Sequence, residues 1–279
     1  ESHQVDEILA VATSATREAE NGGAFLKAIE RKTGIRARII TGTEEARLIH
    51  LAAVYGVDTP KPAVVIDIGF TESSGGKRGR KLLRCPIESL KLVGVDPGNV
   101  EDVILTHMHY DHAGNAHLFR KARYHIQDRE MQYATGRCMC HGLMRHGYEA
   151  DDVVQMVRYV FDERVHFHDG VREVSPGVEV HHVGGHTRGL QSVRVHTKRG
   201  WVVLASDASH YYEHFEQHRA FPLVYHLGEM LEGFATLRRL ADSLQHIVPG
   251  HDPLVLQRYP AASPQLAGVV ARLDLPPKP

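Results

Sequence analysis

The sequence is poor in several features that would place it in a specialised class of proteins. Its 279 residues include only three cysteines, too few for a disulfide framework. The 33 Lys and Arg residues balance 34 Asp and Glu residues, which argues against broad neutralisation of nucleic-acid phosphates. No apolar run approaches the roughly 18 residues that a transmembrane helix needs, and no secretion signal is visible. These absences predict a cytoplasmic protein with no nucleic-acid or membrane partner.

The pattern along the chain alternates between strands and helices, which is typical of an α/β protein. Strands are predicted over residues 8–13, 35–40, 63–68, 103–106, 178–183, 191–197, 201–205 and 246–248. Helices are predicted over residues 16–33, 43–54, 86–92, 116–121, 150–163 and 228–244. Residues 70–81 are polar, glycine-rich and basic, so we expect a linker or a long surface loop there.

Histidine is the residue in excess, with 21 copies. The densest cluster is Thr106-His107-Met108-His109-Tyr110-Asp111-His112, directly after an apolar strand. The C-terminal end of a strand is where α/β proteins place their sites. His107 and His109 can reach one metal ion, and Asp111 and His112 a second. Imidazole nitrogens combined with a carboxylate suit zinc and similar metals.

Three later strands each end at a further candidate ligand. His186 follows the strand at 178–183, Asp207 follows the strand at 201–205, and His251 follows the strand at 246–248. Each residue alone is a weak signal, because a histidine after glycine is usually a turn residue. Together they supply the donors that a two-metal site needs, including a carboxylate able to bridge. We therefore expect two divalent transition-metal ions, with zinc the first candidate.

This motif set resembles the metallo-β-lactamase superfamily over residues 64–260. The resemblance implies an α/β fold, an αββα sandwich, in which His107, His109 and His186 hold the first metal. It also implies that Asp111, His112 and His251 hold the second metal and that Asp207 bridges the two. Within the superfamily, the run from Thr106 to Asn115, the Gly184–Gly189 run and Ser206–Ser209 look like the N-acyl-homoserine-lactone lactonases.

One position departs from that lactonase group. The group carries a tyrosine three residues after the bridging aspartate, and here that position is His210, followed by Tyr211 and Tyr212. By resemblance, one of these three side chains contacts the substrate carbonyl. Asp111 or Asp207 would then move the proton as a metal-activated water opens the lactone.

The first 69 residues resemble a different family, the exopolyphosphatase and guanosine-pentaphosphate phosphohydrolase family. The likeness lies in residues 11–22 and 39–48 and in the Val65–Gly69 run. Backbone amides of glycine-rich loops grip phosphate in such folds. The family's first phosphate loop is missing, and Phe70 follows Gly69 where the second loop continues with glycines. Residues 1–69 are thus predicted to be a grafted α/β segment without phosphatase activity, and residues 70–279 the hydrolase domain.

These expectations together predict a metal-dependent hydrolase that opens a lactone ring. The main expected substrate is N-acyl-homoserine lactone, whose hydrolysis is called quorum quenching. A hydrolase of another lactone, ester or phosphodiester is an alternative. A poorly active chimera that only scaffolds is a second one. The sequence leaves the oligomeric state open, a homodimer included.

Overall fold

The computed structural model describes residues 10–12, 22–33, 37–39, 63–82 and 84–278. The chain divides into two compact units, Glu1–Lys61 and Pro62–Pro279. We expected the join after residue 69. Strand β3 (Val64–Ile66) pairs with β4 (Asp102–Ile104), so these residues belong to the larger unit.

The described part of the smaller unit contains two strands and one helix. Strands β1 (Ala10–Ala12) and β2 (Ala37–Ile39) pair in parallel, and helix α2 (Gly22–Thr33) lies between them in the chain. A parallel pair needs such a crossover. The helix that we predicted over residues 43–54 lies outside the described residues.

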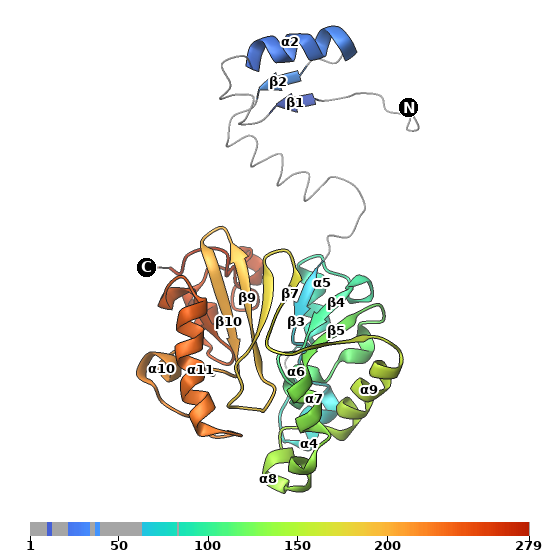
Figure 1. The fold of residues 1–279 in the computed structure, drawn as a ribbon, viewed down its shortest axis with the longest axis vertical. Helices are drawn as coiled ribbons and strands as arrows, with labels where there is room; N and C mark the ends of the chain where they lie inside the picture. The colour runs from blue at the N-terminus through green and yellow to red at the C-terminus, as the bar shows by residue number, and fades with distance from the viewer. Residues whose placement is uncertain (1–9, 13–21, 34–36, 40–62, 83, 279) are drawn as a thin grey trace. The chain divides into compact units, whose positions relative to one another are not determined.

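The larger unit contains two sheets that face each other (Figure 1). The first sheet is parallel throughout, in the order β3, β4, β5 (Arg123–Gln127) and β6 (Val165–His168). The second sheet has the order β11 (Ile247–Pro249), β10 (Gly200–Ser206), β9 (Gln191–Thr197), β8 (Val178–His182) and β7 (Val171–Ser175). Its strands are antiparallel except β10 and β11.

Helices cover the outer faces of both sheets (Figure 1). Those of the larger unit are α4 (Glu72–Lys77), α5 (Pro86–Leu92), α6 (Tyr110–Ala113), α7 (Asp128–Ala134), α8 (Gly142–Arg145), α9 (Ala150–Phe161), α10 (Tyr212–Gln217), α11 (Leu227–Leu240) and α12 (Leu254–Arg258). Short 3₁₀ turns connect several of them, including Ala116–Leu118.

Alternating side chains produce three apolar layers from two sheets. Ile104, Val180 and Val193 are buried between the sheets. Val203 of β10 belongs to a different cluster, on the outer face of the second sheet, where it packs with Phe234 of α11. Successive side chains of a strand point to opposite faces, so each sheet buries both. The larger unit is the predicted αββα sandwich.

The structure also differs from the expected elements. Residues 70–81 are not a loop throughout, because Thr71 caps α4 by accepting a hydrogen bond from the amide of Ser74 at 3.1 Å. Strands β5, β6 and β7 were missed. Histidines occur within β5 and β6: His125 donates to Asp102 at 2.9 Å and lies 3.0 Å from His168, the last residue of β6. Polar pairs of this kind hide the apolar pattern by which we recognise a strand.

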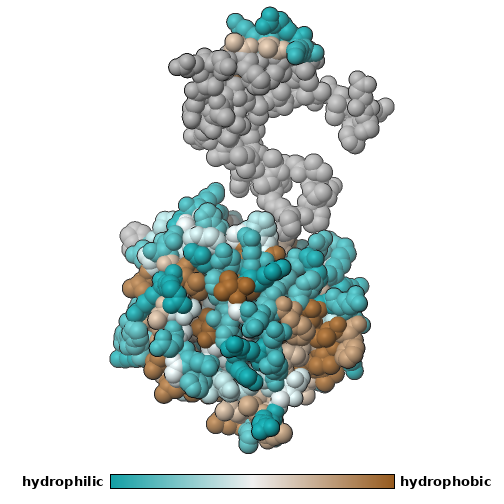
Figure 2. Space-filling model, viewed as in Figure 1, coloured by the Kyte–Doolittle hydropathy of each residue, from teal (hydrophilic) through white to brown (hydrophobic). Residues whose placement is uncertain are grey.

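The surface of the larger unit mixes polar and apolar residues (Figure 2). A group of apolar side chains lies over α9, where Val154 and Phe161 are exposed. No helix among the described residues is long and apolar enough to cross a membrane. The three cysteines are all free thiols.

Candidate metal centre

The candidate ligands meet at one end of the two sheets because each follows a strand. His107, His109 and the start of α6 follow β4. His186 follows β8, Asp207 follows β10, and His251 follows β11. Ser206, the last residue of β10, has a positive φ of 49°, which turns the chain just before Asp207.

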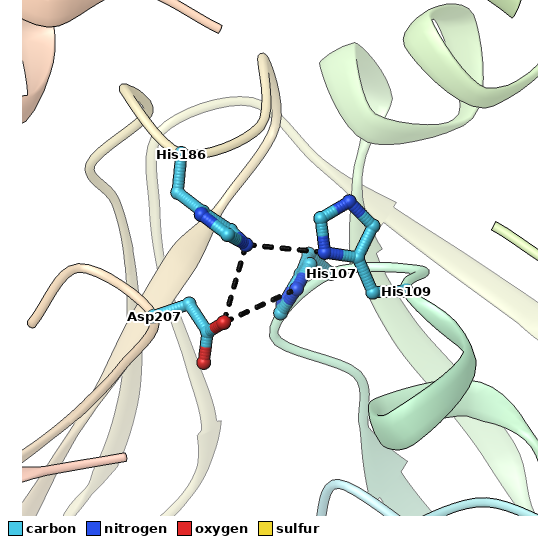
Figure 3. Close-up of side chains that lie close together, drawn as sticks. All are labelled: His107, His109, His186 and Asp207. Atoms are coloured by element: carbon cyan, nitrogen blue, oxygen red, sulfur yellow. Dashed lines mark hydrogen bonds and ion pairs between the residues drawn. The ribbon is translucent and has the colours of Figure 1, made fainter. Parts of the chain in front are cut away.

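Four of the predicted ligands form a compact first group: His107, His109, His186 and Asp207 (Figure 3). His186 Nε2 lies 3.1 Å from His109 Nδ1 and 3.1 Å from Asp207 Oδ2. His107 Nε2 lies 3.9 Å from the same oxygen. Two loops of the second sheet supply His186 and Asp207, while the loop after β4 supplies the other two (Figure 3).

A second group gathers on the other oxygen of Asp207. His251 Nε2 lies 3.0 Å and His112 Nε2 lies 3.3 Å from Asp207 Oδ1. Asp111 joins His112 and His251 in one cluster of donors, with its Oδ1 4.0 Å from His112 Nε2. The structure thus brings all seven predicted metal ligands together, with Asp207 between the two groups.

The protonation of the buried histidines fits a metal site. Asp67 Oδ2 accepts a hydrogen bond from His112 Nδ1 at 2.8 Å, which leaves His112 Nε2 facing the site. His107 Nε2 and His112 Nε2 are both buried without a hydrogen-bond partner. A buried polar atom without a partner is costly, and a metal ion would satisfy both. A carboxylate behind a ligating histidine is also the usual outer support of a metal site.

Burial and neighbouring charges set the protonation of His107, His109 and Asp207 in favour of metal binding. Burial lowers the pKa of His107 and His109 well below the usual histidine value, so both are neutral at neutral pH. For Asp207, burial raises the pKa, but His112 and the hydrogen bonds from surrounding histidines outweigh it and hold that pKa well below its usual range. The neutral imidazoles of His107 and His109 and the ionised carboxylate are suitable metal donors. Burial lowers the pKa of His112, but Asp207 and Asp67 outweigh it and raise that pKa well above the usual value, so a metal ion there would displace a proton.

A pocket of about 470 Å³ opens on this centre. His210 and Tyr211 line it, whereas Tyr212 is buried in the core beside α11 and does not. His210 Nε2 donates to Asp207 Oδ2 at 2.9 Å, and its ring packs on Phe221 with centroids 4.0 Å apart. The placement therefore favours His210 and Tyr211 over Tyr212 for a substrate contact.

Comparison with known proteins agrees with this geometry. Residues 50–251 match the metallo-beta-lactamase superfamily, which is more than half of the chain. The chain belongs to the metallo-β-lactamase superfamily. Residues 1–80 match the Ppx/GppA phosphatase family, so the resemblance expected for the N-terminal segment is confirmed too.

The superfamily relatives include enzymes of known name. The chain is 29% identical over 182 residues to an N-acyl homoserine lactonase of Bacillus thuringiensis, covering 60% of this chain and 67% of that protein. It is 28% identical over 184 residues to the lactonase AiiB of Agrobacterium fabrum, covering 60% and 66% of the two proteins. A solved quorum-quenching N-acyl homoserine lactone lactonase aligns with a TM-score of 0.58 and 26% identity, covering 70% of this chain and 77% of that one.

Two residues that support the metallo-β-lactamase centre were not assigned to the site from the sequence. Asp67 was quoted only as part of a strand motif. It has a positive φ of 52° and accepts from the amide and hydroxyl of Thr106 at 2.8 Å each. Glu130, on α7, was missed entirely. Nothing in the sequence around Glu130 predicts that this acidic side chain is buried, so its role is visible only in the folded structure.

Glu130 holds two ligand loops with one carboxylate. It is fully buried. Its Oε1 accepts from the amide of Met108, between the two histidines, at 3.0 Å and from the Tyr148 hydroxyl at 2.7 Å. Its Oε2 accepts from the Thr187 hydroxyl at 2.6 Å and from the Gly189 amide at 3.1 Å, just after His186. Glu130 is thus a positioning residue that connects the β4 and β8 loops.

We expect both Glu130→Gln and Glu130→Ala to weaken the metal site, and the alanine variant to weaken it more. The Gln amide still accepts on one side, but its NH₂ faces a backbone N–H that cannot rotate away. Each buried group left without a partner costs about 1–3 kcal/mol, and Ala leaves both loops without an acceptor. Metal affinity should fall by roughly 10- to 100-fold, as for loss of outer-shell partners.

Denaturant unfolding and competition with a metal chelator measure the two effects. The matched control is Glu179→Gln, a half-buried carboxylate on β8 that pairs with Arg194 and lies outside the pocket lining. Unchanged metal affinity in Glu130→Ala would show that the carboxylate does not hold the ligand loops.

Proposed function

We propose that this protein is a metal-dependent hydrolase that opens the lactone ring of N-acyl-homoserine lactones. The observation that carries the proposal is the placement of six donor side chains in two groups, which meet at the two oxygens of Asp207. The relatives named lactonases above support the same reaction class. In this proposal, all the metal ligands lie within residues 70–279, and residues 1–69 contribute no ligand, although Asp67 holds His112 in place.

Each residue then has a stated task. His107, His109 and His186 would hold one divalent ion, Asp111, His112 and His251 the other, and Asp207 both. Two such ions, zinc in this proposal, would supply an activated water and polarise the lactone carbonyl. Asp111 lines the pocket and is only partly buried, with its side chain 19% exposed. It can therefore take a proton from the water side and pass it to the departing ring oxygen.

His210 is proposed as the donor to the substrate carbonyl oxygen. Its Nε2 lies 2.9 Å from Asp207 Oδ2, which would ligate a metal in this proposal, so the N–H would turn from that oxygen to the substrate carbonyl. Phe221 packs against the ring. Burial lowers the pKa of His210, although hydrogen bonding to Asp207 opposes this, so the ring is a neutral donor. A well-placed neutral donor stabilises charge that develops on the carbonyl oxygen.

We expect His210→Ala to lower kcat by about 100-fold, the lower end for loss of such a donor, whereas His210→Tyr keeps activity equal or raises it. Tyr211→Phe should have little effect, and Tyr212→Phe should change stability only. The measurement is steady-state lactone opening by each zinc-loaded variant. No change in His210→Ala together with a large loss in Tyr211→Phe would transfer the role to Tyr211.

A substrate panel tests the proposed function directly. The zinc-loaded protein is assayed with N-hexanoyl-homoserine lactone, a simple γ-lactone, an aryl ester and a bis-aryl phosphodiester. We expect the acyl-homoserine lactone to have the highest kcat/KM and the chelated protein to be inactive. A higher value for the phosphodiester would replace the proposal by a phosphodiesterase.

We further propose a cytoplasmic location, supported by three free thiols and no disulfide. The small-molecule substrate is the only partner in the proposal, with no nucleic acid or membrane.

A further inference from the structure

A group of basic side chains lies on the rim of the metal-centre pocket. Lys77, Arg78 and Arg80 line the same pocket as His109, Asp111 and His251. They come from the end of α4 and the turn after it, the stretch expected to be a solvated loop. Gly79, with a φ of 63°, reverses the chain between the two arginines. A neutral acyl chain carries no negative charge that these three cations could bind.

Arg78 is a structural residue. Its NH2 donates to the carbonyls of His146 at 3.2 Å and Tyr148 at 3.3 Å. Its NH1 pairs with Glu149, and its guanidinium lies 4.0 Å from the centre of the Tyr110 ring. Its donors are therefore occupied by protein groups.

Lys77 shares the same carboxylate. Its Nζ lies 2.9 Å from Glu149 Oε2, and its side chain is 56% exposed. Glu149 faces both Lys77 and Arg78, and Asp151 also lies close enough to interact with Lys77, so Lys77 is an exposed cation whose charge is largely compensated. Charge near a partly exposed rim attracts anions and is weakened by salt.

Arg80 has donors to spare. Its NH1 donates to the Tyr110 hydroxyl, and no carboxylate oxygen lies within 4.0 Å of it among the residues that the structure describes. A guanidinium has five N–H donors in a fixed fork. Because Tyr110 is buried and sits between His109 and Asp111, this contact fixes Arg80 relative to the metal ligands.

We propose that Arg80 forms an anion subsite at the rim of the pocket and that the preferred substrate is a lactone whose acyl chain ends in a carboxylate. This inference rests on the proposed lactonase function. The fork of Arg80 matches a carboxylate in a bidentate geometry. The carboxylate would bind at the rim while the lactone carbonyl lies at the metal centre.

The test compares two lactones of equal chain length, N-hexanoyl- and N-adipoyl-homoserine lactone. We expect the zinc-loaded protein to have a kcat/KM at least about tenfold higher for the adipoyl lactone, since charge-assisted hydrogen bonds are the strong ones. Arg80→Gln should remove that preference, so that the kcat/KM values for the two lactones become equal. Arg80→Lys should retain part of it. Arg120→Gln removes an exposed charge outside the pocket lining and is the matched control.

A binding measurement separates failure of the subsite from failure of the proposed reaction. Calorimetry with the ring-opened products, N-adipoyl- and N-hexanoyl-homoserine, needs no turnover. Tighter binding of the adipoyl product, lost in Arg80→Gln and weakened by salt, supports the subsite even if neither lactone is opened. Equal affinities, no binding of the adipoyl product, or an equal effect of Arg80→Gln on both compounds would overturn it.

Discussion

Asp207→Asn is expected to reduce lactone opening by more than the roughly 10- to 100-fold that loss of an outer-shell partner costs. The Asp207 carboxylate is buried and lies within 3.3 Å of His112, His186, His210 and His251. Asn preserves the shape but removes the negative charge, and one of its two polar atoms becomes a donor. A single oxygen cannot serve both ligand groups, so we expect one metal to be lost more readily than the other.

The measurement for Asp207→Asn is metal content by elemental analysis together with kcat on the same preparation. Asp102→Asn is the matched control. It changes a half-buried carboxylate that binds Arg123 and His125 on the strand pair β4–β5, away from the pocket lining. Wild-type turnover in Asp207→Asn would show that Asp207 is not a ligand.

His109→Ala should abolish hydrolysis and lower the thermal stability of the metal-loaded protein. It removes Nδ1, which lies 3.1 Å from His186 Nε2 in the first ligand group. A site held at about 100 times its Kd stabilises the fold by roughly 2.7 kcal/mol. For a unit of this size that corresponds to a Tm lower by roughly 5–10 °C.

The control for His109→Ala must lose a buried histidine without touching the metal centre. His125→Ala meets this need, because His125 is buried and bonded to Asp102 and His168 on the other side of β5 from α9. We expect His125→Ala to lower Tm but to keep both metals and turnover. If chelator lowers the Tm of His109→Ala as much as that of the wild type, His109 does not hold a metal.

The metal ligands could be predicted from the sequence because several of them directly follow a predicted strand. His107, His186 and Asp207 each follow an apolar strand that periodicity identifies, and parallel or sandwiched strands bring their ends together. The resemblance to a known superfamily then assigned a role to each one. The αββα arrangement followed from the same resemblance, and the paired sheets agree with it.

Other parts could not be predicted because tertiary contacts alone define them. Glu130 is buried only because two distant loops donate to it. Arg80 reaches the pocket only because α4 and Gly79 fold a polar stretch back onto Tyr110. Tyr211 and Tyr212 are neighbours in sequence, yet only the first lines the pocket, since adjacent residues at the start of α10 point in different directions.

A zinc titration of the metal-free protein, with lactone opening followed at each step, tests the central claim most directly. The account predicts that the hydrolysis rate of N-hexanoyl-homoserine lactone rises with bound zinc and levels off at two ions per chain, one for the histidines near each oxygen of Asp207. A folded chain that retains less than one ion, or one that binds two ions and opens no lactone of the panel, would contradict it.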